Sequence, residues 1–233
     1  MKWNKQFDYP KSMRSLINDK RHYEVGKEKL PSVTTVLAET QSQEKKDSLE
    51  SWRQRVGPAV ADKIKDDAAA RGTAMHSILE HYVLGTNKLD MTETGNMAHG
   101  MAEQIIEHGL KNRLSEIWGS EVTLYYPGLY AGATDLVGIY DGVASIVDFK
   151  QSNKPKRREW ITDYFTQLGG YAMAHNYVYG TKITQGVNLI CTKDNFFQEF
   201  IVKDDEFVDY QHQFLERVNQ YYDQLRSRSE KTE

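Results

Sequence analysis

The sequence contains one cysteine, Cys191, among 233 residues. A single cysteine cannot form an intramolecular disulfide, a zinc ribbon or a four-cysteine iron–sulfur cluster. No stretch approaches the ~18 consecutive apolar residues that span a bilayer, and residues 1–9 lack the apolar segment of a signal peptide. The phosphate-binding pattern G-x-x-x-x-G-K-[ST] is also missing. We therefore expect an intracellular protein that uses neither a membrane nor a nucleoside triphosphate.

The sequence also lacks an excess of positive charge. It has 30 Lys and Arg against 33 Asp and Glu, a net charge of −3, so any contact with nucleic acid must come from local basic patches. Its hydrophobic share of 39% and charged share of 27% are typical of a globular protein. We interpret residues 1–58 as an N-terminal arm and helical extension, 59–226 as the core and 227–233 as a polar tail, together forming a single domain.

The most informative stretch is residues 132–150, which has the pattern of a β-hairpin. Asp141 and Gly142 separate two runs rich in β-branched and aromatic residues. An Asp-Gly pair favours a two-residue type I′ turn, in which both residues take a positive φ. Followed outward, the register of that turn places Asp135 opposite Asp148. Directly opposed like charges are destabilising, so another group must offset this repulsion.

Lys150 follows Asp148 by two residues, so both side chains project from the same face of the strand. The rest of the hairpin is apolar on both faces, which predicts a sheet covered on both sides. Buried charges are costly unless they are paired or bind a metal. Two carboxylates beside one lysine suit a divalent cation such as Mg²⁺. The hairpin alone leaves open the alternative of a salt-bridged pair at its solvent end.

The remaining pattern alternates helices and strands. A helix start is predicted at residues 30–37, and helices are predicted at 45–55, 59–84, 96–114, 159–179 and 204–225. Strands are predicted at residues 121–126, in the two arms of the hairpin, and at 185–192 and 196–202. Residues 1–30 show no clear period and are expected to form an irregular arm or a short ribbon. This order predicts a mixed α/β or α+β domain around a central sheet.

Three residues of the predicted helix at 59–84 lie on one face, because Gly72, His76 and Glu80 are spaced four apart. Glycine inside a helix costs ~1 kcal/mol relative to alanine, so we expect another group to approach closely at Gly72. His76 is then a candidate metal ligand beside the two aspartates. A histidine satisfied by core contacts is the alternative.

Two patterns downstream of Lys150 suggest contacts with substrate. Lys154, Lys156 and Arg157 form a basic run just beyond the suspected metal site. Such a run is either a phosphate-binding surface or a solvated face. Gln167 and Tyr171 lie one turn apart on the following helix, a pairing that carries little information by itself.

Taken in order, these motifs resemble a known family. Asp135, Asp148 and Lys150 resemble the PD-(D/E)XK nuclease signature. The patterns G-x-x-x-H at residues 72–76, G-x-x-D at 132–135 and Q-x-x-x-Y at 167–171 are similar to its RecB-like exonuclease branch. The segment Leu-Pro-Ser-Val-Thr-Thr at 30–35 is also similar to one in that branch. The set resembles most the stand-alone members, including mitochondrial and phage-encoded exonucleases. Threonine before Asp135, where the family name has proline, is a mild departure.

The resemblance implies a restriction-endonuclease-like core, a central mixed sheet flanked by helices, with an N-terminal helical extension. It implies Mg²⁺ or Mn²⁺ as cofactor, bound by His76, Asp135, Asp148 and the main-chain carbonyl of Phe149. The implied catalytic residues are Asp135, Asp148 and Lys150, and the implied substrate-binding residues are Gln167, Tyr171, Lys154, Lys156 and Arg157. Glu80 and Glu121 remain open between holding a water near the metal and facing solvent.

The resemblance also implies a function: a metal-dependent DNA exonuclease that hydrolyses phosphodiester bonds from a free end of single-stranded or linear DNA. DNA repair or recombination in the cytoplasm of a bacterial or phage-infected cell is the expected setting, with a recombination or replication protein as a possible partner. Two alternatives remain. One is a structure-specific or restriction-type endonuclease on the same core, and the other is a non-catalytic nucleic-acid-binding module.

Overall fold

A six-stranded mixed sheet forms the centre of the computed structural model, which describes residues 1–230 and leaves the last three residues of the expected polar tail outside the described part. The strand order is β1-β5-β6-β7-β8-β9. The strands are β1 (Lys2–Trp3), β5 (Leu114–Tyr126), β6 (Tyr130–Tyr140), β7 (Val143–Ser152), β8 (Gln185–Thr192) and β9 (Phe197–Lys203). β1 pairs with β5, and β7 with β8, in parallel, while the other pairs are antiparallel. The expected mixed α/β architecture is confirmed.

The hairpin of β6 and β7 has the predicted turn and register. Asp141 and Gly142 have φ values of 48° and 80°, as a type I′ turn requires. The strands pair from Tyr140 with Val143 as far as Leu136 with Val147. Asp135 and Asp148 are the next residues outward, just past the end of this ladder. The two carboxylates therefore lie where the strands stop pairing.

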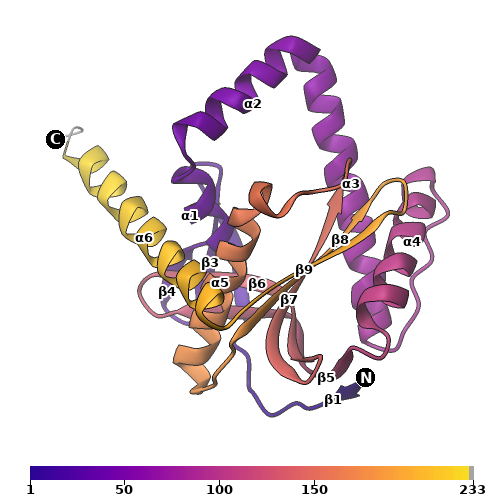
Figure 1. The fold of residues 1–233 in the computed structure, drawn as a ribbon. Coiled ribbons are helices and arrows are strands. Elements are labelled where there is room, and N and C mark those ends of the chain that lie inside the picture. Colours follow the sequence, from indigo (N-terminus) through magenta and orange to yellow (C-terminus); the bar gives the residue numbers. More distant parts are fainter. Residues whose placement is uncertain (231–233) are drawn as a thin grey trace.

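Helices cover the sheet on both faces (Figure 1). α3 (Pro58–Val83) and α4 (Glu93–Ile105) pack on one face, and α5 (Thr162–Tyr179) and α6 (Asp204–Ser229) on the other. A π-helical turn (Ile106–Leu110) extends α4, and a 3₁₀ turn (Arg158–Trp160) precedes α5. The predicted helix at 96–114 is too long, because Asn112 takes a positive φ of 61° and β5 starts at Leu114. That strand is correspondingly longer than the predicted 121–126.

Two further helices join the N-terminal region to α3. α1 (Val33–Glu39) begins after Ser32, whose hydroxyl accepts a hydrogen bond from the Thr35 N–H at 2.9 Å. α2 (Gln43–Val56) has no buried residue and forms an arch with the start of α3 above one end of the sheet (Figure 1). Gly57, with a φ of 87°, makes the bend between these helices. Ion pairs connect α2 to its surroundings: Lys45 lies 2.8 Å from Asp163 of α5, and Arg53 lies 2.5 Å from Asp62 of α3.

The N-terminal region is more ordered than an irregular arm. β2 (Ser12–Ile17), β3 (Lys20–Val25) and β4 (Glu28–Pro31) form a separate three-stranded antiparallel sheet. The helix start predicted within residues 30–37 is present, because α1 begins at Val33 with Ser32 as its N-cap. Leu30 lies before it in β4, where it pairs with Tyr23 and is buried beside Ala131. The helical extension is therefore a small sheet followed by α1 and α2.

We retain a single domain, with residues 1–58 as its extension and 59–226 as its core, as a proposal. Among residues 1–230, no helix combines the length and the apolar character needed to cross a bilayer.

Candidate active site

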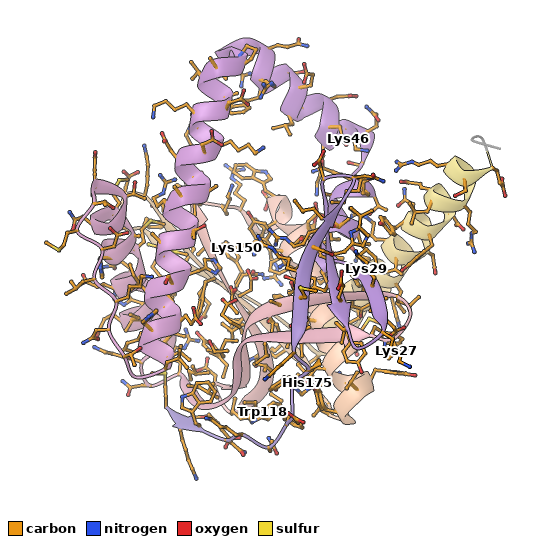
Figure 2. All side chains as sticks on the ribbon, turned by 180° about the vertical axis from the view of Figure 1, so that it is seen from behind. Lys27, Lys29, Lys46, Trp118, Lys150 and His175 are labelled. Atoms are coloured by element: carbon orange, nitrogen blue, oxygen red, sulfur yellow. The ribbon has the colours of Figure 1, made fainter. Side chains whose placement is uncertain are left out.

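A cleft of about 530 Å³ opens where α3, the ends of the sheet strands and the small N-terminal sheet meet. The side chains that the sequence singled out and that line it are His76 and Glu80 from α3, Glu121 from β5, Asp135 from β6, Asp148 and Lys150 from β7, and Gln167 and Tyr171 from α5. Figure 2 shows Lys150 between α3 and the N-terminal sheet. The structure thus brings together eight residues from five elements.

His76, Glu121 and Asp135 form a group with the donor atoms of a metal site. One ligand atom from each lies within 4.8 Å of the others, and Nδ1 of His76 is 3.2 Å from Oδ1 of Asp135. Burial lowers the pKa of His76, but the Asp135 carboxylate outweighs burial and raises that pKa to about 9. The same pairing, opposing the effect of burial, holds the pKa of Asp135 below its ordinary value. A divalent cation bound here would replace the proton shared by this pair.

Glu121, one of the two glutamates whose role the sequence leaves open, is part of this group. Its neighbours Ser120 and Val122 pair with Leu136 and Thr134, so Glu121 lies across from Asp135. Its φ of 52° is unusual for a non-glycine residue inside a strand. Burial and the nearby Asp135 raise the pKa of Glu121 to about 7. The three-residue loop at 127–129 between β5 and β6 pairs Tyr126 with Tyr130. Following that register back along β5 would have placed Glu121 opposite Asp135.

Asp148 and Lys150 form the predicted ion pair, with Nζ of Lys150 2.5 Å from Oδ2 of Asp148. Asp148 is 3% exposed. Burial raises its pKa to about 6 and Asp135 adds to the rise, although Lys150 acts in the opposite sense. Burial lowers the pKa of Lys150, but the two carboxylates outweigh burial and raise it. Lys150 also lies over the Tyr164 ring, 5.3 Å from its centroid, so the ammonium group is held in place from two sides.

The peptide between the two charged residues is held by Asp135. The Phe149 N–H donates to Oδ2 of Asp135 at 2.6 Å, which fixes both the carboxylate and the end of β7. The Phe149 ring packs edge-on to His76 with centroids 6.1 Å apart. A ligand role for the Phe149 carbonyl remains a proposal.

Gln167 and Tyr171 lie on the inner face of α5, behind the carboxylates. The Gln167 amide donates to Oδ1 of Asp148 and to the Tyr171 hydroxyl, both at 3.4 Å. A Cβ at Gly132 would lie 2.9 Å from the Tyr171 ring, so glycine at this position is needed for α5 to approach β6. Gln167 therefore orients Asp148 at the same time as it faces the cleft.

The close approach expected at Gly72 is also present, on the other side of the site. A Cβ there would lie 3.2 Å from Cγ of Gln151 on β7. The neighbouring Arg71 donates to Oε1 of Gln151 at 2.8 Å and to Asn153. α3 is therefore fastened to β7 one turn before His76.

The basic run divides into members that border the site and members that do not. Lys154 and Lys156 line an adjoining groove of about 910 Å³ together with Trp52 and Tyr164. Arg157 instead lies over the exposed Trp160 ring, 5.1 Å from its centroid. Arg158 forms two hydrogen bonds of 2.7 Å with Glu206. The two lysines are thus the members of the run best placed near the cleft.

The chain is similar in sequence to known exonucleases. Mitochondrial genome maintenance exonuclease 1 of Homo sapiens is 28% identical over 173 residues, which cover 71% of this chain and 50% of that protein. The Mus musculus protein is 27% identical over 175 residues, with the same coverage. The chain spans about half the length of the curated relatives it matches. No family model matches the sequence. This distant homology confirms the resemblance drawn from the motifs.

Solved structures with partial likeness include an alkaline exonuclease from Laribacter hongkongensis, with a TM-score of 0.31 and 16% identity over 68% of this chain and 84% of that one. That protein has also been solved in complex with dAMP. A protein of Eubacterium rectale, provisionally named an exonuclease, gives a TM-score of 0.46 and 16% identity over 65% and 67% of the two chains. Scores this low indicate only partial superposition.

Proposed function

We propose that this chain, a distant homologue of the mitochondrial genome maintenance exonucleases, is a divalent-metal-dependent deoxyribonuclease that hydrolyses phosphodiester bonds from a free DNA end. The observation that carries the proposal is the meeting of His76, Glu121, Asp135, Asp148 and Lys150 in one cleft. A salt-bridged pair at the solvent end of a hairpin would need neither the histidine nor the third carboxylate. A group of three carboxylates, one imidazole and one lysine within one cleft is suited to metal-assisted hydrolysis.

The side chains fit Mg²⁺ or Mn²⁺. Carboxylate oxygens are the preferred ligands of these hard cations, and imidazole suits the softer Mn²⁺ as well. Oδ2 of Asp148 is buried, and the group that contacts it among the described residues is the Lys150 ammonium, 2.5 Å away. We propose His76, Asp135, Asp148 and the Phe149 carbonyl as ligands, with Glu121 as a further ligand or the acceptor of a metal-bound water. The cation would supply a Lewis acid for the phosphoryl oxygen and an activated water.

The residues of the chain would then divide the remaining work. Lys150 would orient the attacking water and offset the negative charge that develops on the phosphate. Gln167 would hold Asp148 in position through its 3.4 Å hydrogen bond, while Tyr171 supports that amide. Lys154 and Lys156 would bind the phosphate backbone beside the cleft.

The arch formed by α2 supports a requirement for a free end. Grooves beneath it are lined by Trp52 from α2 on one side and by Lys156 and Tyr164 from the body on the other. Trp160, 59% exposed, borders one of these grooves, and aromatic rings of this kind stack on unpaired bases. A strand passing between α2 and the body would be enclosed on both sides. An end could be inserted there, whereas a closed circle could not enter without displacement of α2.

We place this activity inside the cell, bacterial or phage-infected, in DNA repair or recombination, with a replication or recombination protein as a possible partner. These assignments follow from the motif resemblance.

A cleavage time course tests the proposal. End-labelled linear single strands, linear duplex and closed circles are incubated with Mg²⁺, with Mn²⁺ or with chelator, using Asp148→Ala as the control. We expect loss of linear substrate only, in the presence of metal, and none with the variant. Cutting of closed circles would favour an endonuclease, and no cutting of any substrate would favour a binding module.

A further inference from the structure

The small N-terminal sheet contributes two arginines to one wall of the cleft, and neither belongs to the motifs on which the family resemblance rests. Arg14 on β2 and Arg21 on β3 both line the cleft that holds Asp135, Asp148 and Lys150. Among residues 1–230, neither guanidinium forms an ion pair or a hydrogen bond with another side chain. Most other arginines of the chain have such partners, as Arg113 and Arg217 do.

The register of the sheet explains why both arginines point into the cleft. Arg14 pairs with Tyr23, and Leu16 pairs with Arg21, so these four side chains share one face. Tyr23 is buried on that face and packs near Ala131 and Ala133 of β6. The arginines are diagonal neighbours on the same face, where their mutual repulsion is unfavourable unless an anion lies between or beside them.

The wall is fixed to the strands that carry the catalytic carboxylates. The Ser12 hydroxyl lies 2.6 Å from that of Thr123 on β5, and Glu28 accepts a hydrogen bond from the Gly128 N–H at 2.8 Å. Ser32, at the end of the sheet, forms a bridge with Ala131. A phosphate bound by the arginines would therefore be held at a fixed distance from Asp135.

Basic side chains line both the cleft and the adjoining groove. Lys154 and Lys156 line the groove, whereas Arg14 and Arg21 line the cleft that holds the carboxylates. The cleft thus has cations of its own in addition to those of the groove. Arg14 and Arg21 are suited to phosphate because each guanidinium can donate two parallel hydrogen bonds to it.

We propose that Arg14 and Arg21 bind a phosphate group of the DNA strand and so hold the strand in register on one side of the scissile bond. This inference rests on the proposed nuclease function. The phosphate is either internal to the strand or at its end, since both have the same chemistry. The exposed Leu16, 67% exposed between the two arginines, would contact the adjoining sugar.

The test compares the double variant Arg14→Ala/Arg21→Ala with Lys11→Ala/Lys27→Ala. The control removes the same charge from the same region, at residues that do not line the cleft; Figure 2 shows Lys27 at the far end of the small sheet. Binding of a labelled single strand is measured by fluorescence anisotropy with Ca²⁺ in place of Mg²⁺, across a range of salt concentrations. Matched melting temperatures for the two variants establish that both fold.

We expect the arginine variant to bind about 100-fold more weakly and to lose about 0.7 from the slope of log K against log salt, the value for one phosphate contact of a single strand. The control should change less than about threefold. If the arginine variant loses affinity for 5′-phosphorylated and 5′-hydroxyl strands alike, the arginines bind an internal phosphate. If it loses affinity for the phosphorylated strand alone, they bind the terminal phosphate. Both results support the proposal.

Unchanged DNA binding by the arginine variant, with altered Mn²⁺ affinity instead, would overturn the proposal and leave the arginines as partners of the carboxylates. The wild-type cleavage assay separates the two hypotheses. If the wild type cuts DNA and the arginine variant binds and cuts equally well, the inference fails while the nuclease function stands.

Discussion

At the scale of single residues, Lys150 is the most direct test of the chemistry. Lys150→Ala removes the cation beside Asp148 and should reduce the cleavage rate by about 100-fold or more, as loss of a charge-stabilising donor does in other active sites. DNA binding under Ca²⁺ should change little, because Lys154 and Lys156 remain. Lys182→Ala, which removes an exposed lysine that lines neither the cleft nor the adjoining grooves, is the matched control. Cleavage by Lys150→Ala at the wild-type rate would remove Lys150 from the mechanism.

Glycines on the two sides of the site should differ in their tolerance of a methyl group. Gly132→Ala places a Cβ 2.9 Å from the buried Tyr171 ring and should lower the free energy of unfolding by about 1–3 kcal/mol, the usual cost of overpacking. Gly72→Ala meets the flexible Gln151 side chain at 3.2 Å and gains up to ~1 kcal/mol of helix propensity. Urea unfolding of both variants measures the difference. A Gly132→Ala variant as stable as the wild type would show that the α5 contact with β6 is looser than described.

The residues of the site differ in how well they could be predicted from the sequence. The Asp141-Gly142 turn was enough to place Asp135 beside Asp148, because a two-residue turn fixes register locally. His76 and Gln167 needed the motif resemblance, because their contacts with the hairpin join elements far apart in the chain. Arg14 and Arg21 carry no motif and depend on a small sheet docking against β6. No local pattern contains that information.

At the scale of elements, α2 combines an absence of buried residues with a position above the grooves. Such a helix contributes little to the core, so its sequence is free to serve binding. Trp52→Ala should weaken binding of single-stranded DNA by about 1–3 kcal/mol, the usual contribution of one stacked base, with a melting temperature within a few degrees of the wild type. Gln54→Ala, an exposed residue on the same helix that does not line the grooves, is the control.

Anisotropy measurements with single-stranded and blunt duplex DNA distinguish this role from a general loss of affinity. Stacking on Trp52 requires unpaired bases, so the variant should lose affinity for the single strand and retain it for the duplex. Equal losses on the two ligands would instead assign α2 to the phosphate backbone.

The elements themselves were predicted unevenly, for a physical reason. The core helices and the two hairpins have strong local signals, including the Asp-Gly turn and regular apolar spacing. The N-terminal sheet has few apolar residues, chiefly Tyr23, Val25 and Leu30, and these are buried by contact with Ala131 rather than with one another alone. A segment stabilised by docking gives little periodic signal of its own. The end of α4 was missed because the helical pattern continues past residue 105 into a π turn.

At the scale of the whole molecule, the site sets how stability depends on pH. The pKa values of His76, Asp148 and Glu121 are raised to about 9, 6 and 7 from 6.5, 3.8 and 4.5. At these three groups the folded protein holds more protons than the unfolded chain between about pH 4 and pH 9, so their contribution makes the free energy of unfolding fall as the pH rises through this range. His175, whose pKa burial lowers to about 4, acts in the opposite sense between about pH 4 and pH 6.5. Asp135, whose pKa is lowered, has the opposite effect but only below about pH 4.

Metal binding should reverse this trend, because the cation takes the place of the protons on the same side chains. A ligand at 100 times its Kd stabilises the folded state by ~2.7 kcal/mol, which corresponds to roughly 5–10 °C in Tm for a chain of this size. We expect the rise in Tm caused by Mn²⁺ to be larger at pH 8.5 than at pH 6, since fewer protons must then be displaced from His76 and Glu121. Differential scanning fluorimetry with and without Mn²⁺ at the two pH values measures this rise in Tm.

The variant Asp135→Ala lacks a central ligand and should show no rise in Tm at either pH. A rise as large as that of the wild type would place the cation elsewhere in the molecule.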